Sequence, residues 1–303
     1  MKKVNLIGDM GGPSAFAQRT SLYSSWLGAK MNSKDLSLPK VVMQVLCKLH
    51  EQPVDNAVVF TIFERSYLTA KEVALLNRAR VVAVPQPLAH VCKKSGVRVP
   101  VEAIAYGVAD VYQPDPAVVM PGRVFLTAGR PQHGPRKDIQ RVIHAFLYAT
   151  KERMDAVLQV KLPPDAVVPN IRSSHVQYIT DSLSGTEMAR WYNQGLVFVS
   201  PSWGEGWGLH EHEAMACGKA VITTRRTGIC SIVPKEGLFV VQSKQVQGYF
   251  VPSFESLCDA ITTVLDAPQR ALTRGHYVQL FVHNRFSLEH EKRSVRKVVA
   301  AYA

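Results

Sequence analysis

The residues with the clearest chemical potential lie together between positions 196 and 223. Gly204, Gly206 and Gly208 alternate with bulkier residues after a short apolar run, and a helical pattern follows from about 210 to 216. Glycine allows the backbone to turn tightly and to approach a ligand closely, while a helix N-terminus offers unbonded N–H groups and a positive dipole end. We therefore predict a strand, a glycine loop, a helix and a strand, with a phosphate site at the loop.

Two glutamates accompany this loop. Glu205 lies in the loop itself, and Glu213 lies early in the predicted helix. A carboxylate repels phosphate but accepts hydrogen bonds from hydroxyl groups. The pair therefore indicates a ligand that carries both phosphates and hydroxyls, either a nucleotide with its ribose or a nucleotide sugar.

The same stretch resembles the glutamate-pair signature of retaining GT-B glycosyltransferases, the group 1 or family 4-like enzymes. The family pattern is roughly S-x-x-E-G-[FW]-G-L-x-x-x-E-A-M-A-x-G-x-P-V-I, and this sequence departs from it at Ala220 and His210, where proline is usual or frequent. A generic Rossmann-type turn with surface glutamates is the alternative interpretation. The matching residues are Ser202, Glu205, Gly206, Trp207, Gly208, Leu209, Glu213, Ala214, Met215, Ala216, Gly218, Val221 and Ile222.

The resemblance implies a role for each of these groups. Glu205 would hold hydroxyls of the transferred sugar, Glu213 would hold the ribose, and backbone N–H groups of the glycine loop would bind the diphosphate. The donor would be a UDP- or GDP-sugar, used as a substrate without any further cofactor. The donor-binding residues implied on this stretch are Gly206, Trp207, Gly208, Leu209 and Glu213.

Cations for the diphosphate are implied further upstream. The family places an Arg and a Lys after the first strand of the donor domain, and Arg130 and Lys137 occupy those places. Their spacing is two residues longer than in the commonest form, so Arg136 is an alternative to Lys137. Arg binds phosphate through two parallel hydrogen bonds, whereas Lys acts as a point charge. Together with Glu205, these cations are the catalytic residues that the resemblance implies; solvated surface charge is the alternative.

A metal site is the other interpretation of the helix that follows the loop, because His210, Glu211 and His212 precede Glu213. Their spacing is not H-E-x-x-H, and the two histidines would point to different sides of a helix. We therefore expect no metal there.

The N-terminal segment has the β-α pattern of a nucleotide-binding domain. A strand is predicted at 4–8, a helix follows a glycine turn, and a second helix is predicted at 35–51. The turn lacks a complete G-x-G-x-x-G pattern. By the resemblance, Gly11 and Gly12 lie at a cleft near the donor phosphate, with a plain tight turn as the alternative.

The acceptor site is the least defined part of the sequence. A strand is predicted at 57–63, and Glu64 and Arg65 follow at its carboxyl end, where ligands bind in open α/β sheets. The surrounding run resembles a bacterial subgroup of the same family, except that Arg80 and Gln86 replace the usual Asp and Ser. We therefore assign Glu64 and Arg65 to the acceptor site, with a helix cap or an interdomain salt bridge as alternatives for Glu64. The residues that match the subgroup are Phe63, Glu64, Leu76, Asn77, Pro85, Ser95, Gly96, Val97, Pro100, Gly107, Val108 and Asp110.

A proline-rich junction at 114–122 marks the expected domain boundary. We predict an α/β protein of the GT-B class, with two Rossmann-like domains facing across a cleft. The acceptor domain would comprise residues 1–117 and the nucleotide-sugar donor domain residues 118–285. A basic helix at 286–303 would cross back and pack on the first domain, as it does in proteins of this class.

Length and composition are consistent with this architecture. The 303 residues are 47% apolar and carry a net charge of +12. The basic excess favours polyanionic neighbours, namely nucleic acid, an anionic membrane or phosphorylated substrates. The five scattered cysteines indicate reduced thiols, and we recognise neither a signal peptide nor a transmembrane segment. We expect a cytoplasmic protein, located in the host cytoplasm if it is viral.

Several functions fit these features. The first hypothesis is retaining, metal-independent transfer of a sugar to an acceptor hydroxyl, with a hydroxymethylated base in viral DNA as the acceptor. The second is transfer to a glycan or a lipid-linked acceptor at the membrane face. A non-catalytic module that binds nucleotide sugars and a sugar-nucleotide epimerase of similar fold are further alternatives.

Overall fold

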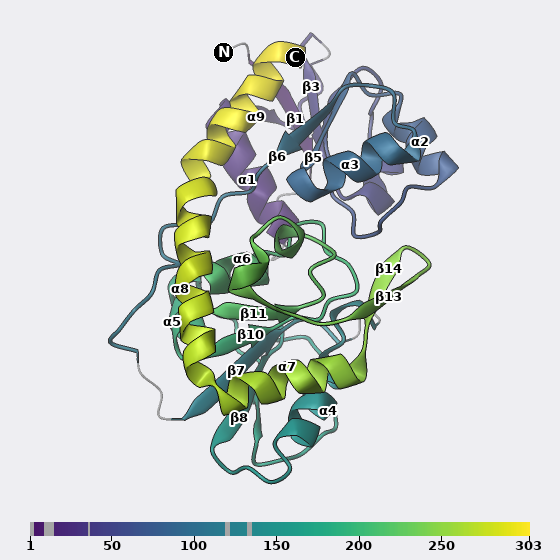
Figure 1. Ribbon diagram of the computed structural model, residues 1–303. Helices are drawn as coiled ribbons and strands as arrows, with labels where there is room; N and C mark the ends of the chain where they lie inside the picture. The colour runs from purple at the N-terminus through teal and green to yellow at the C-terminus, as the bar shows by residue number, and fades with distance from the viewer. Residues whose placement is uncertain (1–2, 9–14, 36, 119–121, 132–134) are drawn as a thin grey trace. The chain divides into compact units, whose positions relative to one another are not determined.

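The computed structural model describes residues 3–8, 15–35, 37–118, 122–131 and 135–303, and it separates into two compact units. The first unit comprises Met1–Gly107 together with Phe286–Ala303, and the second comprises Val108–Arg285. Each unit contains a parallel six-stranded sheet (Figure 1). The predicted α/β fold with two Rossmann-like domains is therefore confirmed, as is the return of the last helix to the first domain.

The sheet of the first unit has the order β2-β1-β3-β4-β5-β6, and all its neighbouring strands run parallel. Its central strands are nearly continuous apolar runs that are rich in valine, as expected for a parallel sheet covered on both faces. The strand bounds are β1 Asn5–Gly8, β2 Lys30–Met31, β3 Lys40–Met43, β4 Val58–Phe60, β5 Val81–Pro85 and β6 Val101–Ile104.

Local signals fix the helix ends in this unit. The Thr69 side chain and Glu72 form a reciprocal capping box at the start of the second helix. Gly96, with a φ of 100°, ends the third helix in the left-handed conformation that favours glycine. The helices are α1 Ala15–Leu27, α2 Ala70–Leu76, α3 Gln86–Ser95 and α9 Leu288–Tyr302, with a 3-10 helix, η1, at Leu46–Glu51.

The predicted helix at 35–51 is wrong. Residues 40–43 form strand β3, which pairs with both β1 and β4 inside the sheet. Pro39 disfavours a continuous helix through this region, and Val41 and Val42 are fully buried β-branched residues, which favour a central strand. Only the last part of the segment is helical, as η1.

The sheet of the second unit has the order β12-β11-β10-β7-β8-β9, again with parallel neighbours. A short antiparallel hairpin, β13 and β14, follows it in the chain. The strand bounds are β7 Arg123–Ala128, β8 Ala156–Lys161, β9 Val176–Ile179, β10 Val197–Val199, β11 Ala220–Thr223, β12 Leu238–Val240, β13 Ser243–Val246 and β14 Tyr249–Pro252.

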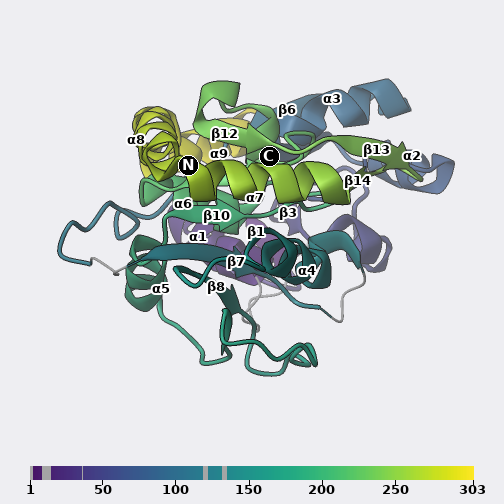
Figure 2. The same ribbon diagram turned by 60° about the horizontal axis from the view of Figure 1, so that its bottom comes forward.

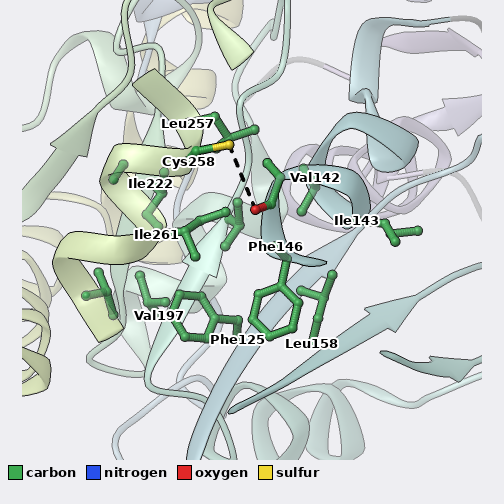
Figure 3. Packing of buried hydrophobic residues seen from close by; sticks show 14 of the residues in the cluster. Phe125, Val142, Ile143, Phe146, Leu158, Val197, Ile222, Leu257, Cys258 and Ile261 are labelled. Carbon is green, nitrogen blue, oxygen red and sulfur yellow. Dashed lines mark hydrogen bonds between the residues drawn. The ribbon is translucent and has the colours of Figure 1, made fainter. Parts of the chain in front are cut away.

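Helices α4 and α7 lie side by side and cover one face of this sheet (Figures 1 and 2). Phe125, Phe146 and Ile261 belong to the apolar core that joins these helices to the strands (Figure 3). The helices of the unit are α4 Ile139–Ala149, α5 Gly185–Asn193, α6 Leu209–Ala216, α7 Phe254–Asp266 and α8 Pro268–Arg285, with 3-10 helices η2 Pro135–Lys137, η3 Ile229–Ser231 and η4 Lys235–Gly237.

The motif-bearing segments take the predicted secondary structure. Strand β10 leads through the glycine loop into α6, and Gly218, with a φ of 76°, follows the end of that helix. Within the described ranges, no helix combines the length and apolarity that crossing a membrane requires.

Candidate functional site

The site lies at the carboxyl ends of β7 and β10, which are neighbours in the second sheet. From β7 the chain continues to β8 and β9 on one side, and then crosses to β10 on the other side of β7. Ligands of open α/β sheets bind where the strand order reverses in this way, because the loops after the two strands diverge there. The predicted cations follow β7, and the glycine loop follows β10, so the topology brings the two motifs to one edge.

Lys137 and Arg136 both contact Glu205 at this edge. Lys137 Nζ lies 2.6 Å from Glu205 Oε1, and a guanidinium N–H of Arg136 donates to the same oxygen over 3.0 Å. The Ser202 hydroxyl donates to Oε1 as well, over 2.6 Å. Arg136 also donates to the carbonyl of Gly204, so the two loops are joined by a compact charged cluster of Arg136, Lys137, Ser202 and Glu205.

The electrostatics of this cluster favour charged forms. Burial would raise the pKa of Glu205, but the adjacent Lys137 and Arg136 outweigh it, and the pKa of the carboxyl is lowered. Burial would lower the pKa of Lys137, yet Glu205 and, to a smaller extent, Glu211 raise it. Each partner thus keeps the other ionised, as expected for a hydrogen-bonded pair.

The glycine loop is held in place from a second loop. The N–H of Gly228 donates to the carbonyl of Glu205 over 3.1 Å, and that of Ile229 donates to the carbonyl of Trp207. Gly208, with a φ of 85°, precedes the first residue of α6, which leaves the N–H groups of the first helical turn available for an anion. The Trp207 indole is buried and donates to His212 Nδ1 over 3.0 Å, so only the backbone of Trp207 could meet a ligand.

Glu213 lies one turn further along α6, with hydroxyl groups around it. Tyr192 of α5 donates to Glu213 Oε2 over 2.9 Å, and Tyr112 is also hydrogen-bonded to Glu213. His210 Nδ1 lies 2.9 Å from the Tyr192 hydroxyl. The second predicted glutamate therefore belongs to a polar network of its own.

Arg130 has a partner outside the charged cluster. Its guanidinium forms two hydrogen bonds to Asp165, of 2.7 and 2.8 Å. Asp165 follows β8, the strand next to β7. Arg binds phosphate with the same bidentate geometry. The carboxylate of Asp165 therefore occupies the guanidinium N–H groups of Arg130 that a phosphate would use.

The candidate residues of the first unit belong to other settings. Gly11 and Gly12 lie outside the described residues. Arg65 forms an ion pair with Glu72 of α2, and its guanidinium stacks over the Tyr67 ring at 5.3 Å. Glu64 also takes part in polar interactions. Arg65 is therefore engaged in a local pair that the sequence did not indicate.

Several residues of the site were missed from the sequence. Ser202 is part of the matched motif, yet its contact with Glu205 was not predicted. Asp165, in the loop after β8, contacts Arg130, and Tyr192 of α5 contacts Glu213. No spacing in the sequence links these pairs, since each contact depends on which strands and helices are neighbours.

The residues considered for a metal site have separate partners. His210 faces Tyr192 and Glu213, whereas the buried His212 accepts from the Trp207 indole. Over the described ranges, the structure places no three His, Cys, Asp or Glu side chains together as metal ligands.

The fold and this arrangement define the class of the protein: the chain has the GT-B fold of glycosyltransferases. Sucrose-phosphate synthase from Thermosynechococcus elongatus superposes with a TM-score of 0.73 at 16% identity, over 99% of this chain and 100% of that one. HepE of Anabaena, solved in complex with UDP and glucose, gives a TM-score of 0.74 at 13% identity with the same coverage. At such identities the likeness is one of fold.

A family model matches the second unit. Residues 122–267 match the model of the glycosyl transferases group 1. The serotype-specific mannosyltransferase WbdA of Escherichia coli is 33% identical over 109 residues. That match covers 33% of this chain but only 13% of the relative, so the chain corresponds to a small part of that protein.

Proposed function

We propose that this protein transfers a sugar from a nucleoside-diphosphate sugar to an acceptor hydroxyl, with retention of anomeric configuration. The observation that carries the proposal is the cluster of Arg136, Lys137 and Glu205 at the strand-order reversal of a group 1 glycosyl transferase domain. Cations next to a glycine loop and a helix N-terminus suit a diphosphate, and the carboxylate suits hydroxyls.

The charge changes of the reaction explain why these groups are needed. Breaking the sugar–phosphate bond leaves negative charge on the diphosphate, which Lys137 and the N–H groups of 206–209 stabilise. Arg130 joins them when its guanidinium exchanges the exposed carboxylate of Asp165 for a phosphate group. Losing one preorganised donor of this kind typically costs about 3–4 kcal/mol, or roughly a hundred- to a thousandfold in rate. These cations supply the charge that a metal ion provides elsewhere, so the proposed reaction is metal-independent.

Glu205 serves both the cations and the sugar in this scheme. Because Lys137, Arg136 and Ser202 all approach Oε1, a sugar hydroxyl would donate to Oε2. Glu213 holds the ribose. No protein base is assigned, because the leaving phosphate itself can accept the proton of the acceptor hydroxyl.

The acceptor that we propose is a hydroxymethylated base in DNA. Its support is the net charge of +12, since a protein that neutralises DNA phosphates with Lys and Arg gains affinity by counterion release. A glycan or lipid-linked acceptor at a membrane surface is the second candidate, favoured by the match to a mannosyltransferase.

A screen of nucleotide sugars tests the donor part of the proposal. UDP-glucose, GDP-mannose and related donors are added singly, and a bound donor is expected to raise the melting temperature by mass action. Release of the nucleoside diphosphate is then measured with hydroxymethylated DNA or a glycan as acceptor. Binding without turnover or hydrolysis would instead identify a non-catalytic module.

Substitutions test the assignment of the site. Lys137→Met, Arg130→Ala and Glu213→Ala are each expected to reduce donor turnover about a hundredfold or more while leaving the protein folded. Lys151→Met, at a lysine whose side chain is 65% exposed, is the matched control and should keep full activity. Full activity in the three site variants would contradict the assignment.

The choice of acceptor has its own measurement. If the protein neutralises DNA phosphates, the logarithm of its binding constant for duplex DNA should fall steeply and linearly with the logarithm of the salt concentration. Binding to anionic vesicles, with none to DNA at the same salt concentration, would favour the membrane-face acceptor instead.

A further inference from the structure

The carboxylate of Glu213 is held by a network that the proposed chemistry does not use. The hydroxyl of Tyr192 lies 2.9 Å from Glu213 Oε2 and also 2.9 Å from His210 Nδ1. Tyr192 is completely buried, and its ring packs against Trp191, Phe198 and Tyr112. Its hydroxyl is therefore placed by the core of the domain and cannot swing away from Glu213 without disturbing that packing.

The direction of the protons in this network can be worked out. A tyrosine hydroxyl has one hydrogen to donate, and an ionised carboxylate can only accept. If the Tyr192 proton goes to Glu213, then His210 must donate its own Nδ1–H to the Tyr192 oxygen. His210 thus sets the direction of the Tyr192 hydroxyl, and Tyr192 sets the position of Glu213 Oε2.

Tyr112 adds a second donor to the same carboxylate. Its ring meets that of Tyr192 edge-on, with centroids 6.1 Å apart, and its hydroxyl is hydrogen-bonded to Glu213. Burial and the Glu213 charge raise the pKa of both tyrosines well above their ordinary value. Both hydroxyls therefore remain protonated donors at any physiological pH.

Glu213 nevertheless remains accessible, since its side chain is 19% exposed. A carboxylate has about four lone-pair positions on its two oxygens, so two tyrosine donors leave positions for further hydroxyls. Fixing the carboxylate in advance lowers the entropy cost of ordering it around a ligand. A pair of neighbouring hydroxyls on a five-membered sugar ring would match the two carboxylate oxygens.

We propose that Tyr192, oriented by His210, is a positioning residue that fixes the Glu213 carboxylate for the ribose hydroxyls and so makes the site select ribonucleotides over 2′-deoxyribonucleotides. This inference rests on the proposed function, in which Glu213 binds the ribose of the donor. Without the Tyr192 hydroxyl, the carboxylate has more freedom and the selectivity is reduced.

The test compares UDP and GDP with their 2′-deoxy forms by titration calorimetry. The variants are Tyr192→Phe, which removes only the hydroxyl, and Tyr148→Phe, a matched control on α4 at a tyrosine that is 61% exposed. In the wild type and in the control, the ribonucleotide is expected to bind more tightly than its deoxy form. In Tyr192→Phe, the ribonucleotide should bind about tenfold more weakly, and the affinity for the deoxy form should change little.

Equal weakening of both nucleotides in Tyr192→Phe would indicate a packing role and overturn the inference, while the proposed function would stand. An unchanged ratio of the two affinities would overturn it as well. If neither UDP nor GDP binds the wild type, a different result follows: the proposed donor fails, and the inference fails with it.

A double-mutant comparison separates an effect through Glu213 from an independent one. In a Glu213→Gln background, Tyr192→Phe is expected to cause no further loss of ribose selectivity, because residues that act through one contact are not additive. Additive losses of selectivity would show that Tyr192 does not act through Glu213.

Discussion

At the scale of single residues, the candidate site is organised by one oxygen atom. Glu205 Oε1 receives Lys137, Arg136 and Ser202, and the same carboxylate is only 11% exposed. A buried carboxylate without such partners would be strongly disfavoured, so the cations stabilise the glutamate as much as the glutamate stabilises them. A donor diphosphate would add a second anion to this cluster of Arg136, Lys137 and Glu205. The ionisation of Glu205 and Lys137 is therefore the property to measure.

The charge balance predicts a dependence of stability on pH. The pKa of Glu205 is lowered in the folded protein, so its ionised form stabilises the fold above the unfolded value of about 4.3, and this stabilisation is lost as pH falls through the lower folded value. The pKa of Lys137 is raised, so its contribution is present below about pH 10.4 and is lost as pH rises through the folded value.

Melting temperatures of the wild type and of Glu205→Gln, measured from about pH 2 to 8, check the acidic limb. The wild type should be the more stable protein near neutral pH, and the difference should shrink below about pH 4. Glu152→Gln, at a carboxylate that is 84% exposed, should follow the wild type throughout. A difference that stays constant down to the lowest pH would contradict the ionised pair.

At the scale of elements, the loop at 224–228 acts as a brace for the glycine loop. Gly228 has a φ of 55°, and a Cβ atom built there would lie 2.4 Å from the Trp207 carbonyl oxygen. Such a distance is far shorter than a van der Waals contact. Gly228 and Trp207 belong to two short loops that are hydrogen-bonded to each other and hold Glu205. The position therefore requires glycine for conformation and for space at once.

Gly228→Ala is expected to displace the glycine loop, to lower the melting temperature and to weaken nucleotide binding at least tenfold, since misplaced catalytic groups are costly. Gly28→Ala is a closely matched control, because Gly28 has a φ of 56° and no atom within 4 Å of the added Cβ. The control should lose only about 1 kcal/mol of stability from backbone strain and keep its affinity. Equal effects on binding from both variants would argue against a brace at Gly228.

Most elements that carry motifs could be predicted from the sequence, because their apolar runs and glycine positions are local signals. The helix predicted at 35–51 was wrong because Pro39 and the β-branched pair Val41 and Val42, which favour a strand in the middle of the sheet, were not given enough weight. The two motifs that form the charged cluster were also recognised from short stretches of sequence, but the role of Tyr192 was not. Tyr192 is 21 residues from Glu213 in the chain, and only the packing of α5 beside α6 brings the two together.

At the scale of the whole molecule, the last helix completes the first unit. The buried Glu291 of α9 forms an ion pair with Arg19 of α1, accepts from the Tyr23 hydroxyl over 2.9 Å and accepts from the Gly107 N–H over 2.8 Å. Arg19 in turn donates to the Gly107 carbonyl. A carboxylate near the end of the chain thus joins the first helix to Gly107, three residues after β6, so the first unit depends on a segment that is remote in sequence.

This anchor predicts that Glu291→Ala destabilises the first unit selectively. Removing one partner of a buried pair leaves an uncompensated charge and typically costs about 3–5 kcal/mol, here on Arg19, whose side chain is 8% exposed. Hydrogen exchange followed by mass spectrometry should show faster exchange in α1 and α9, with the core strands of the second unit, such as β7 and β8, unchanged. Glu289→Ala, two positions earlier at a side chain that is 60% exposed, should leave both units protected. Unchanged exchange in α9 of Glu291→Ala would mean that apolar contacts alone hold the helix, since Val295, Val298 and Val299 on its buried face would then suffice to fix it without the ion pair.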